Sequence, residues 1–495
     1  MANALDQIVQ VSIDLNQPPR DERSFGVTLI VGPPPAVQRN PDGTVAEIDL
    51  PPVGAYSSAD EVKAAGFTTI GDGADPVGAA ARVGFSQMPA PERVVIAVKQ
   101  RAEFDPALYS CYTTDDISAI IPPPEPPIDP APPALFLVAK YPAASGTVPL
   151  ITRNGETYAG AVIVQGTDGT TQFCIIDLLA ESTATFDIVL PESTSAQGKA
   201  IKLEYVARWS AEDSTAAIQT VNNSDFENIE DTLDRALDYG GWYGIGPAGV
   251  SETDCAAISQ WAEAQEVIAC FPVGTLEDIK SIQYRSFDIE PRTDGKQLAE
   301  DVPGDNRYAN VAYLCRNLAY QPGSVTWAFK TLSGIEPGLF SSTYKAMLEA
   351  KNANYYIRIA GTNNTQGGKV RAGEWIDVIH FRDWLKNDIQ LRVFSLLRAN
   401  PKLPFTDGGI QLVKNQMEAS LRQGQVYNGI APDEFNEEGE LIPGFVTSVP
   451  LAANLTPTQK ASRTLTDCTF AARLAGAIHA VRIRGALVYE LPAVS

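Results

Sequence analysis

Two helical patterns joined by a short proline-containing turn constrain the fold of this chain more than any other stretch. In the first pattern, apolar residues recur at three- and four-residue steps and so share one stripe of an α-helix: Trp375, Val378, Phe381, Leu385, Ile389, Val393 and Leu396. Pro401 and Pro404 end this helix, because proline cannot continue one. Thr406 then has the side chain of an N-cap, and Gly424 is placed to cap the end of a second helix. The stripe of that second helix consists of Ile410, Val413, Met417 and Leu421.

Strand and helix patterns alternate around this helical pair, which predicts α/β layers. Buried strands are predicted at residues 26–32, 93–99, 241–245, 266–271 and 355–359. Helices are predicted to begin at Ser58, Asp75, Ser224, Ser251, Asp305 and Ser341, several of which have the side chains of N-caps. Residues 361–369 are rich in Gly, Asn and Thr and are predicted to form a polar loop.

A proline-rich stretch interrupts the α/β pattern. Residues 121–134 are dense in proline, which favours an extended and stiff linker. Five short strand patterns follow without helical periodicity, at residues 135–140, 161–165, 172–179, 184–190 and 199–207. We therefore expect a multidomain α/β chain with α+β elements: a mixed-sheet α/β core, an inserted small antiparallel β domain and extended N- and C-terminal strand arms. The expected parts are an N-terminal arm (1–23), an outer domain (24–345) with the β insertion at 135–210, and a C-terminal domain (346–495).

The two ends of the sequence have strand patterns of their own. Val9, Val11, Ile13 and Leu15 alternate with polar residues near the N-terminus. Near the C-terminus, Cys468 to Leu474 alternate, a turn follows at Gly476–Ile478, and a last strand contains Val481, Ile483 and Leu487. A lone strand leaves its backbone groups unpaired, so each must join a sheet. From the pattern alone, that sheet belongs either to the same domain or to a neighbouring molecule.

Charge and composition narrow the classes of partner. The 495 residues carry a formal net charge of -22, which disfavours nucleic acid and anionic membrane as direct partners because both are polyanions. No apolar run is long enough to predict a transmembrane helix, and no signal peptide is evident. Residues 456–495 differ from the rest, because five basic residues against two acidic ones give a local charge of +3. The basic residues are Lys460, Arg463, Arg473, Arg482 and Arg484, and the acidic ones are Asp467 and Glu490.

No motif predicts catalysis, a cofactor or a bound metal. His380 follows Asp377 by one helical turn, a spacing that we interpret as a surface hydrogen bond rather than a catalytic pair. The segment 361–369 ends in Gly-Gly-Lys but has Val370 where a phosphate loop needs Ser or Thr. Five carboxylates between residues 433 and 440 could hold calcium, but a solvated acidic loop is the simpler interpretation. The sequence therefore predicts no enzyme and no cofactor.

Several short motifs, taken in their order along the chain, resemble the contractile tail sheath proteins of myophages. They lie outside residues 100–220, and the most extensive group surrounds the helical pair. That group comprises Asn354–Tyr356, Gly373–Leu385, Pro404–Ile410 and Leu421–Gly429. The others are Phe85–Pro89 with Glu92 and Arg93, Trp242–Gly244, and Gln321–Ser324 with Trp327 and Lys330.

The resemblance implies a structural subunit of a phage tail in the virion, assembled in the host cytoplasm. Such subunits form stacked hexameric rings around a tail tube protein, between a baseplate and a tail terminator, and contract to drive the tube through the host envelope. It further implies that Val9–Leu15 and Val481–Leu487 are strands donated to neighbouring subunits. The tube would be faced either by the turn of Gly476, Ile478 and His479 or by Lys460 and Arg463. The alternatives are a static tail tube or baseplate component and a cytosolic α/β enzyme.

Removing residues 1–18 tests the N-terminal arm. We expect the shortened chain to fold as a monomer but to build no long tubes, because its neighbours would lack a strand. Negative-stain electron microscopy of the purified chains measures this difference. Normal polymerisation of the shortened chain would show that these residues are not a donated strand.

Overall fold

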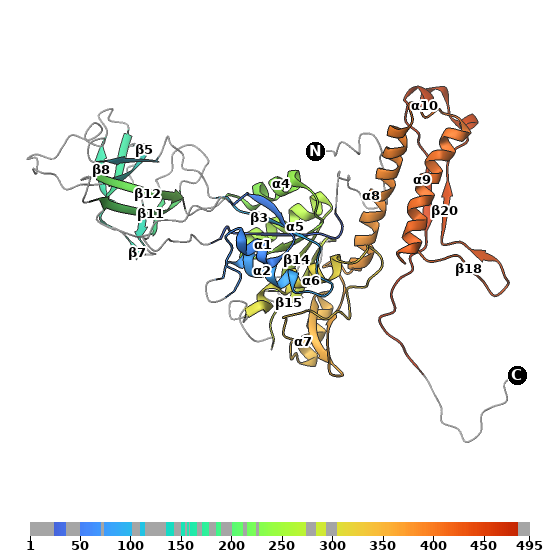
Figure 1. Ribbon diagram of the computed structural model, residues 1–495, viewed down its shortest axis with the longest axis horizontal. Coiled ribbons are helices and arrows are strands. Elements are labelled where there is room, and N and C mark those ends of the chain that lie inside the picture. The colour runs from blue at the N-terminus through green and yellow to red at the C-terminus, as the bar shows by residue number, and fades with distance from the viewer. Residues whose placement is uncertain are drawn as a thin grey trace, which may run out of the picture. The chain divides into compact units, whose positions relative to one another are not determined.

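The computed structural model describes residues 24–35, 50–70, 74–100, 227–273, 284–293 and 304–483, together with short stretches, mostly strands, between residues 109 and 223. The chain divides into two compact units (Figure 1), which are considered separately. The first contains the described residues within 1–33, 53–97 and 233–495, and the second those within 34–52 and 98–232.

An eight-stranded sheet forms the centre of the first unit, in the order β17-β16-β15-β14-β13-β1-β3-β2. Its strands are β1 (Thr28–Gly32), β2 (Val53–Tyr56), β3 (Val94–Val98), β13 (Gly244–Pro247), β14 (Ile268–Pro272), β15 (Ser286–Glu290), β16 (Asn354–Ile359) and β17 (Thr362–Gln366). The five strands from β16 to β1 run parallel, whereas β2 and β17 pair antiparallel with their neighbours. This mixed sheet confirms the predicted mixed α/β fold class.

Helices accompany the sheet at the places where the sequence carries caps. They are α1 (Ala59–Ala64), α2 (Pro76–Phe85), α4 (Ile229–Tyr239), α5 (Glu252–Gln265), α6 (Ala309–Leu318) and α7 (Ser342–Ala350), and a 3-10 turn (Gly304–Tyr308) precedes α6. The hydroxyls of Ser58, Ser251 and Ser341 accept hydrogen bonds from backbone N–H groups three residues further on, which confirms the predicted cap at Ser58 and the predicted helix starts at Ser251 and Ser341. Helix α6 packs closely on β13, because a Cβ added at Gly246 would lie 2.8 Å from Val311 Cγ2.

The two predicted helices near residue 400 form an antiparallel pair, α8 (Ile376–Ala399) and α9 (Asp407–Val426) (Figure 1). The predicted stripes meet in one buried cluster of Phe381, Leu385, Ile389, Val393, Met417, Leu421 and Ile430. Thr406 is the N-cap of α9, since its hydroxyl accepts from Gly409 N at 3.3 Å. The prediction for Gly424 was wrong: α9 continues past it, and a Cβ there would lie 2.9 Å from Ile430 Cδ1. Glycine at this position allows close packing rather than ending the helix.

The polar loop predicted for residues 361–369 is in part a strand. Thr362–Gln366 form β17, which pairs with β16 from Ile359↔Thr362 to Tyr355↔Gln366. Ala360 and Gly361 at the turn both have positive φ, of 48° and 86°. Two such residues are typical of the tight turn that joins antiparallel strands. The strand was missed because it consists of polar residues, and β15 was missed as well.

The second unit contains only antiparallel strand pairs in its described residues. One sheet has the order β4-β5-β9-β8: β4 (Tyr109–Thr113), β5 (Leu135–Pro142), β9 (Thr171–Asp177) and β8 (Val162–Gln165). The other has the order β12-β11-β10-β6-β7: β12 (Thr215–Asn223), β11 (Ala200–Ser210), β10 (Thr185–Val189), β6 (Leu150–Arg153) and β7 (Glu156–Thr157). All five predicted strands are present, whereas β4, β6, β7 and β12 were not predicted. The predicted linker at 121–134 lies outside the described residues.

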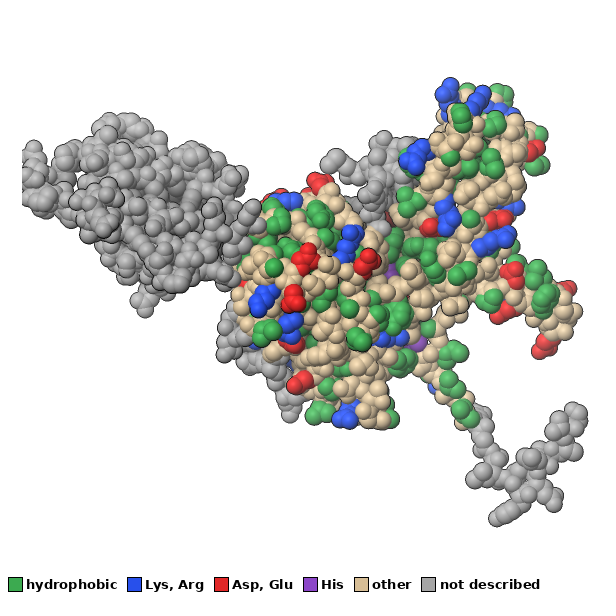
Figure 2. All heavy atoms as spheres, in the orientation of Figure 1, with side chains coloured by type: hydrophobic (Ala, Val, Ile, Leu, Met, Phe, Trp, Pro, Cys, Tyr) green, Lys and Arg blue, Asp and Glu red, His purple; other side chains and the backbone are tan. Residues whose placement is uncertain are grey.

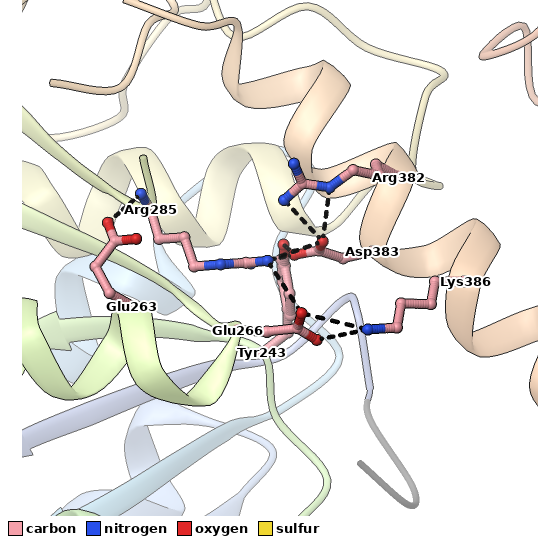
Figure 3. A network of polar contacts seen from close by, with 7 residues as sticks. All are labelled: Tyr243, Glu263, Glu266, Arg285, Arg382, Asp383 and Lys386. Carbon is pink, nitrogen blue, oxygen red and sulfur yellow. Dashed lines mark hydrogen bonds and ion pairs between the residues drawn. The ribbon is translucent and has the colours of Figure 1, made fainter. Parts of the chain in front are cut away.

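Buried ionic contacts attach the first half of α8 to the sheet (Figure 3). Asp383 of α8 binds Arg285 Nη1 at 2.5 Å and accepts a hydrogen bond from the hydroxyl of Tyr243 at 2.7 Å. Lys386, one turn further along α8, binds Glu266 Oε2 at 3.2 Å. Tyr243 and Arg285 directly precede β13 and β15, and Glu266 lies two residues before β14, so α8 is held at the N-terminal edge of the parallel strands.

The ion-paired side chains of this network keep their charges because each one has a partner of opposite charge. Burial by itself lowers the pKa of Arg285, but the adjacent Asp383 outweighs that effect, and the net pKa is raised. Arg382 binds the second carboxylate oxygen of Asp383 at 3.1 Å, and the backbone N–H of Arg285 donates to Glu263 at 2.6 Å (Figure 3). Removing one member would therefore leave its partner charged and buried.

His380 is inside the protein, so the prediction of a surface hydrogen bond with Asp377 was wrong. Its side chain is 1% exposed, and its Nε2 lies 2.9 Å from the carbonyl oxygen of Phe25. The imidazole also stacks on the ring of Tyr243, with centroids 5.2 Å apart. Burial lowers the pKa of His380 to about 4, although the hydrogen bond to Phe25 and the charge of Asp383 act in the opposite direction. The neutral ring therefore donates its Nε2–H to Phe25.

Replacing Asp383 with alanine tests the network. We expect the free energy of unfolding to fall by about 3–5 kcal/mol, because Arg285 would stay buried without its main counter-charge. The matched control is Asp388→Asn, which breaks the more exposed pair with Arg392 on the same helix and should cost less than about 1 kcal/mol. Denaturant unfolding followed by tryptophan fluorescence measures both. Equal losses for the two variants would contradict a special role for Asp383.

Acidification tests the buried state of His380. A histidine whose pKa is lower in the folded protein than its ordinary 6.5 binds protons more strongly when unfolded. Its stabilising effect is therefore complete above pH 6.5 and is lost as the pH falls toward 4. Between pH 7 and pH 5 we expect this group alone to reduce the free energy of unfolding by about 2 kcal/mol. In His380→Gln, which keeps a donor for Phe25, that part of the pH dependence should vanish; an unchanged slope would refute the assignment.

Candidate assembly site in the C-terminal region

A small sheet lies against the helical pair. Strands β20 (Phe445–Ser448) and β21 (Thr469–Ala472) pair antiparallel, with Phe445 opposite Ala472 and Ser448 opposite Thr469. On the inner face, Phe445, Phe470 and Ala472 pack against the cluster between α8 and α9. The hydroxyl of Thr447 donates to Glu418 Oε1 of α9 at 2.8 Å. On the outer face, Val446 is 54% exposed. The helices thus support one face of the sheet.

The two outer edges of this sheet are the feature that bears on function. Among the described residues, β20 pairs only with β21, and neither has another strand beside it. An unpaired strand edge presents N–H and C=O groups that can bind a further strand. Backbone hydrogen bonds supply the affinity of such an added strand, and the alternating side chains supply its specificity. The sheet can therefore accept a strand at either edge.

The predicted strand from Cys468 to Leu474 is confirmed in its middle, as β21. Beyond it, the chain crosses to the end of α9: Ala431 N donates to Arg473 O at 2.7 Å, and Ala475 N donates to Gly429 O at 3.1 Å. Residues 476–483 form no helix or strand within this chain. Val481 and Ile483 are 72% and 88% exposed. The other predicted arm residues, Leu487 and Val9, Val11, Ile13 and Leu15, lie outside the described residues.

The candidate tube-facing residues fall into two separate places. Lys460 is on α10 (Pro457–Ala461) and Arg463 just follows it, near the turn between α8 and α9, where Ala452 N donates to Asp407 Oδ1 at 2.7 Å. Basic side chains gather at this end of the helical pair in Figure 2. Gly476, Ile478 and His479 instead lie beside the start of α8, since the His479 and Trp375 rings are 4.5 Å apart. The 24 residues of α8, about 36 Å of helix, separate the two groups.

The acidic residues 433–440 are part of a hairpin of β18 (Glu434–Phe435) and β19 (Leu441–Ile442). Asp433 Oδ1 accepts the backbone N–H of Gly444 at 2.7 Å, and Glu434 binds Arg473 at 2.8 Å. Within the part of the chain that the structure describes, no group of three His, Cys, Asp or Glu side chains is placed to hold a metal ion. The same residues include no helix both long and apolar enough to span a membrane.

Sequence reasoning missed β20, half of the candidate acceptor sheet. Its four residues lie between Pro443 and Pro450, where a short strand is hard to distinguish from a loop. The only signal was the alternation of Phe445 and Thr447 with Val446 and Ser448, which becomes informative once β21 is known to pair with it.

Comparison with known proteins gives one sequence match and several structural ones. Residues 376–486, from the start of α8 through the C-terminal segment, match the family described as the C-terminal domain of E217 tail sheath protein gp31-like proteins. No curated protein matches the sequence. The helical sheath of the anti-feeding prophage in its contracted state has a similar fold over 96% of this chain and 98% of its own, with a TM-score of 0.50 at 10% identity. The sheath tail protein of Desulfitobacterium hafniense aligns over 88% of this chain and 93% of its own, at 9% identity and a TM-score of 0.42.

Proposed function

We propose that this chain is a contractile tail sheath subunit, which polymerises around the tail tube of a phage and contracts to drive that tube through the host envelope. The match of residues 376–486 to the C-terminal domain of a tail sheath family supports this proposal. The chain is a structural protein rather than an enzyme. The observation that carries the proposal is a supported two-stranded sheet, neither edge of which pairs with another described strand, in the same domain as an exposed apolar C-terminal segment. A surface and a segment of this kind are what subunits need to pair through strand exchange.

We assign the arms and domains accordingly. The strands donated to neighbours are Val9–Leu15 of the N-terminal arm (1–23) and Val481–Leu487 of the C-terminal arm. Sheet β20–β21 would accept one at each edge, giving four strands drawn from three subunits. Residues 346–495 would form the inner domain, and residues 24–345 the outer one, with the β insertion of 135–210 at larger radius. Stacked hexameric rings would then be joined by backbone hydrogen bonds.

Contraction by such a device requires subunits that move as rigid bodies while their arms stay paired. The ion pairs between α8 and the sheet favour this behaviour, because they join the acceptor sheet's supporting helix to the central fold. Breaking any of them in the interior would expose a charge to an apolar environment, which is costly. The strand pairs between subunits, by contrast, would stay intact if only the short segments that join the arms to the subunit bend.

For the tube we favour the end of the helical pair that carries Lys460 and Arg463. A sheath must slide along or detach from its tube, which suits hydrated charged contacts better than interlocked apolar ones. The further partners proposed are the tail tube protein itself, the baseplate and the tail terminator. The similar fold of the contracted helical sheath of the anti-feeding prophage agrees with self-association and a place in a contractile particle.

Charged substitutions in the C-terminal arm test the proposal. Val481→Asp combined with Ile483→Asp should leave the stability of the monomer unchanged, because both side chains are exposed. The same change should prevent tube formation, since the apolar face of the donated strand could no longer cover a neighbour's sheet. The matched control is Arg482→Gln, on the opposite face of the strand, which should still give tubes.

Negative-stain microscopy of the native chain and both variants provides the measurement. Wide hollow tubes from the native chain would support a sheath. Loss of these tubes in the aspartate variant alone would support the donation of the C-terminal strand to a neighbour. Thin tubes would favour a static tail tube component, and monodisperse particles of the native chain would contradict polymerisation.

A further inference from the structure

Within the described part of the C-terminal segment beyond Ala475, the side chain of His479 is the one that binds the body of its own subunit. The ring of His479 stands edge-on to Trp375, with centroids 4.5 Å apart and an angle of 85°, and edge-on to Phe329, at 5.5 Å and 80°. Its Nε2 lies 2.7 Å from the hydroxyl oxygen of Thr326. The residues on either side make no comparable contact: Ile478 is 83% and Val481 72% exposed. We call this arrangement of His479, Trp375, Phe329 and Thr326 the His479 clasp.

The residues that receive His479 are held firmly by the central fold. Trp375 is the N-cap of α8, forms a β-bridge with Lys369 and has the Lys369 ammonium 4.9 Å from its ring centroid. Phe329 N donates to Thr365 O of β17 at 2.8 Å, and Phe329 has a φ of +61°, which that contact helps to hold. Trp327, between Thr326 and Phe329, is fully buried. The site for the imidazole is therefore built into the subunit rather than formed by mobile side chains.

A carboxyl group, that of Asp377, lies near the same ring. Burial raises the pKa of Asp377, on the first turn of α8, and the nearby His479 opposes that shift. A hollow of about 140 Å³, lined by Asp377, Phe381 and Gly429 among others, separates the core from Leu474 to Ala477. Gly476 turns the chain there with a φ of +66° and no atom near enough to contact an added Cβ. Among the described residues beyond Ala475, the next side-chain contact with the body of the subunit is that of His479.

We propose that His479 is a positioning residue: its ring occupies an aromatic site on its own subunit and fixes the point from which the donated C-terminal strand departs. The proposal rests on the strand donation described above. Residues 479 and 481 can be at most about 7 Å apart, since each residue spans no more than about 3.6 Å. The first residue of the donated strand is thereby tied to Trp375 at the start of α8. The neighbour's acceptor sheet must then lie close to this site.

The clasp also defines a path for force within each subunit. The acceptor sheet β20–β21 packs on α8 and α9, and α8 begins at Trp375, where the subunit's own donated strand is fastened. Tension from one neighbour would enter through the sheet and leave through His479 without passing through Gly476. A segment fastened only at Ala475 would instead leave a flexible glycine turn in that path.

Hydrogen exchange of the unpolymerised full-length chain and microscopy of its polymers test the clasp together. In His479→Ala we expect exchange of the Ala475 amide, which donates to Gly429 O at 3.1 Å next to the released segment, to accelerate by about ten-fold, while the melting temperature stays that of the native chain. Its tubes should be shorter and less regular. His479→Phe, which keeps the ring contacts and loses the hydrogen bond, should recover most of the protection and tube length. Ile478→Ala is the matched control at an exposed neighbour and should change neither quantity.

Three results would overturn the proposal: equal exchange of the Ala475 amide in His479→Ala and the native chain, tubes of native length and order from His479→Ala, or loss of protection at Ala475 when the native chain polymerises. The exchange measurement needs no polymer, so it separates this proposal from the proposed function. Failure of the native chain to form tubes refutes the function, whereas failure of the exchange result refutes the clasp.

Discussion

The contact of Asp383 with Arg285 and Tyr243 is the interaction on which the arrangement of the first unit depends. The N-terminal half of α8 is buried on more than one face, and that is possible only because its polar residues have partners. Asp383 and Lys386 reach charged groups that precede β14 and β15, and His380 reaches the backbone of Phe25. A helix with an apolar stripe alone would lie on the surface of the sheet. In this protein the polar residues of α8 bind specific partners, which fixes both the position and the orientation of the helix.

This attachment explains how a sheet as small as β20–β21 is held in a fixed position. Two strands of four residues are not stable alone, and this pair depends on the apolar cluster between α8 and α9. That cluster in turn depends on α8, whose first turns are fixed by the ionic contacts. The ionic contacts of α8, the apolar cluster and the inner face of the sheet bury different residues. The stability of the sheet therefore does not require that its edges be covered. The edges stay available because the inner face alone supplies the packing.

The sequence predicted those parts of the fold that are determined by neighbouring residues. Serine and threonine caps and the apolar stripes of α8 and α9 depend on spacing along one helix, and they appear where expected. The errors concern groups whose surroundings come from distant residues. His380 was placed on the surface because its partner, Phe25, is 355 positions away. Gly424 was interpreted as a cap because Ile430 and Phe381, which forbid a side chain there, are not adjacent to it in the helix.

The candidate site shows the same limit more strongly. Alternation near the C-terminus predicted β21. No pattern could indicate that one edge of β20 would have no described strand beside it, because that depends on how all the other strands of the chain pair. The position of His479 against Trp375 was equally hidden, since the two residues lie 104 positions apart in the sequence and nothing in either segment specifies the other.

Net charge explains why assembly should depend on strands and local contacts rather than on overall attraction. Copies carrying -22 each repel one another, and at physiological salt that repulsion extends about 8 Å from the surface. Backbone pairing acts only within that distance and has a fixed direction, so it can select one arrangement among surfaces that otherwise avoid contact. The local charge of +3 over residues 456–495 lowers the repulsion where the C-terminal arm must approach a neighbour. If its arms pair as proposed, a subunit built in this way would stay dispersed until its strands are in register, and would then hold its neighbours through contacts that salt and charge affect little.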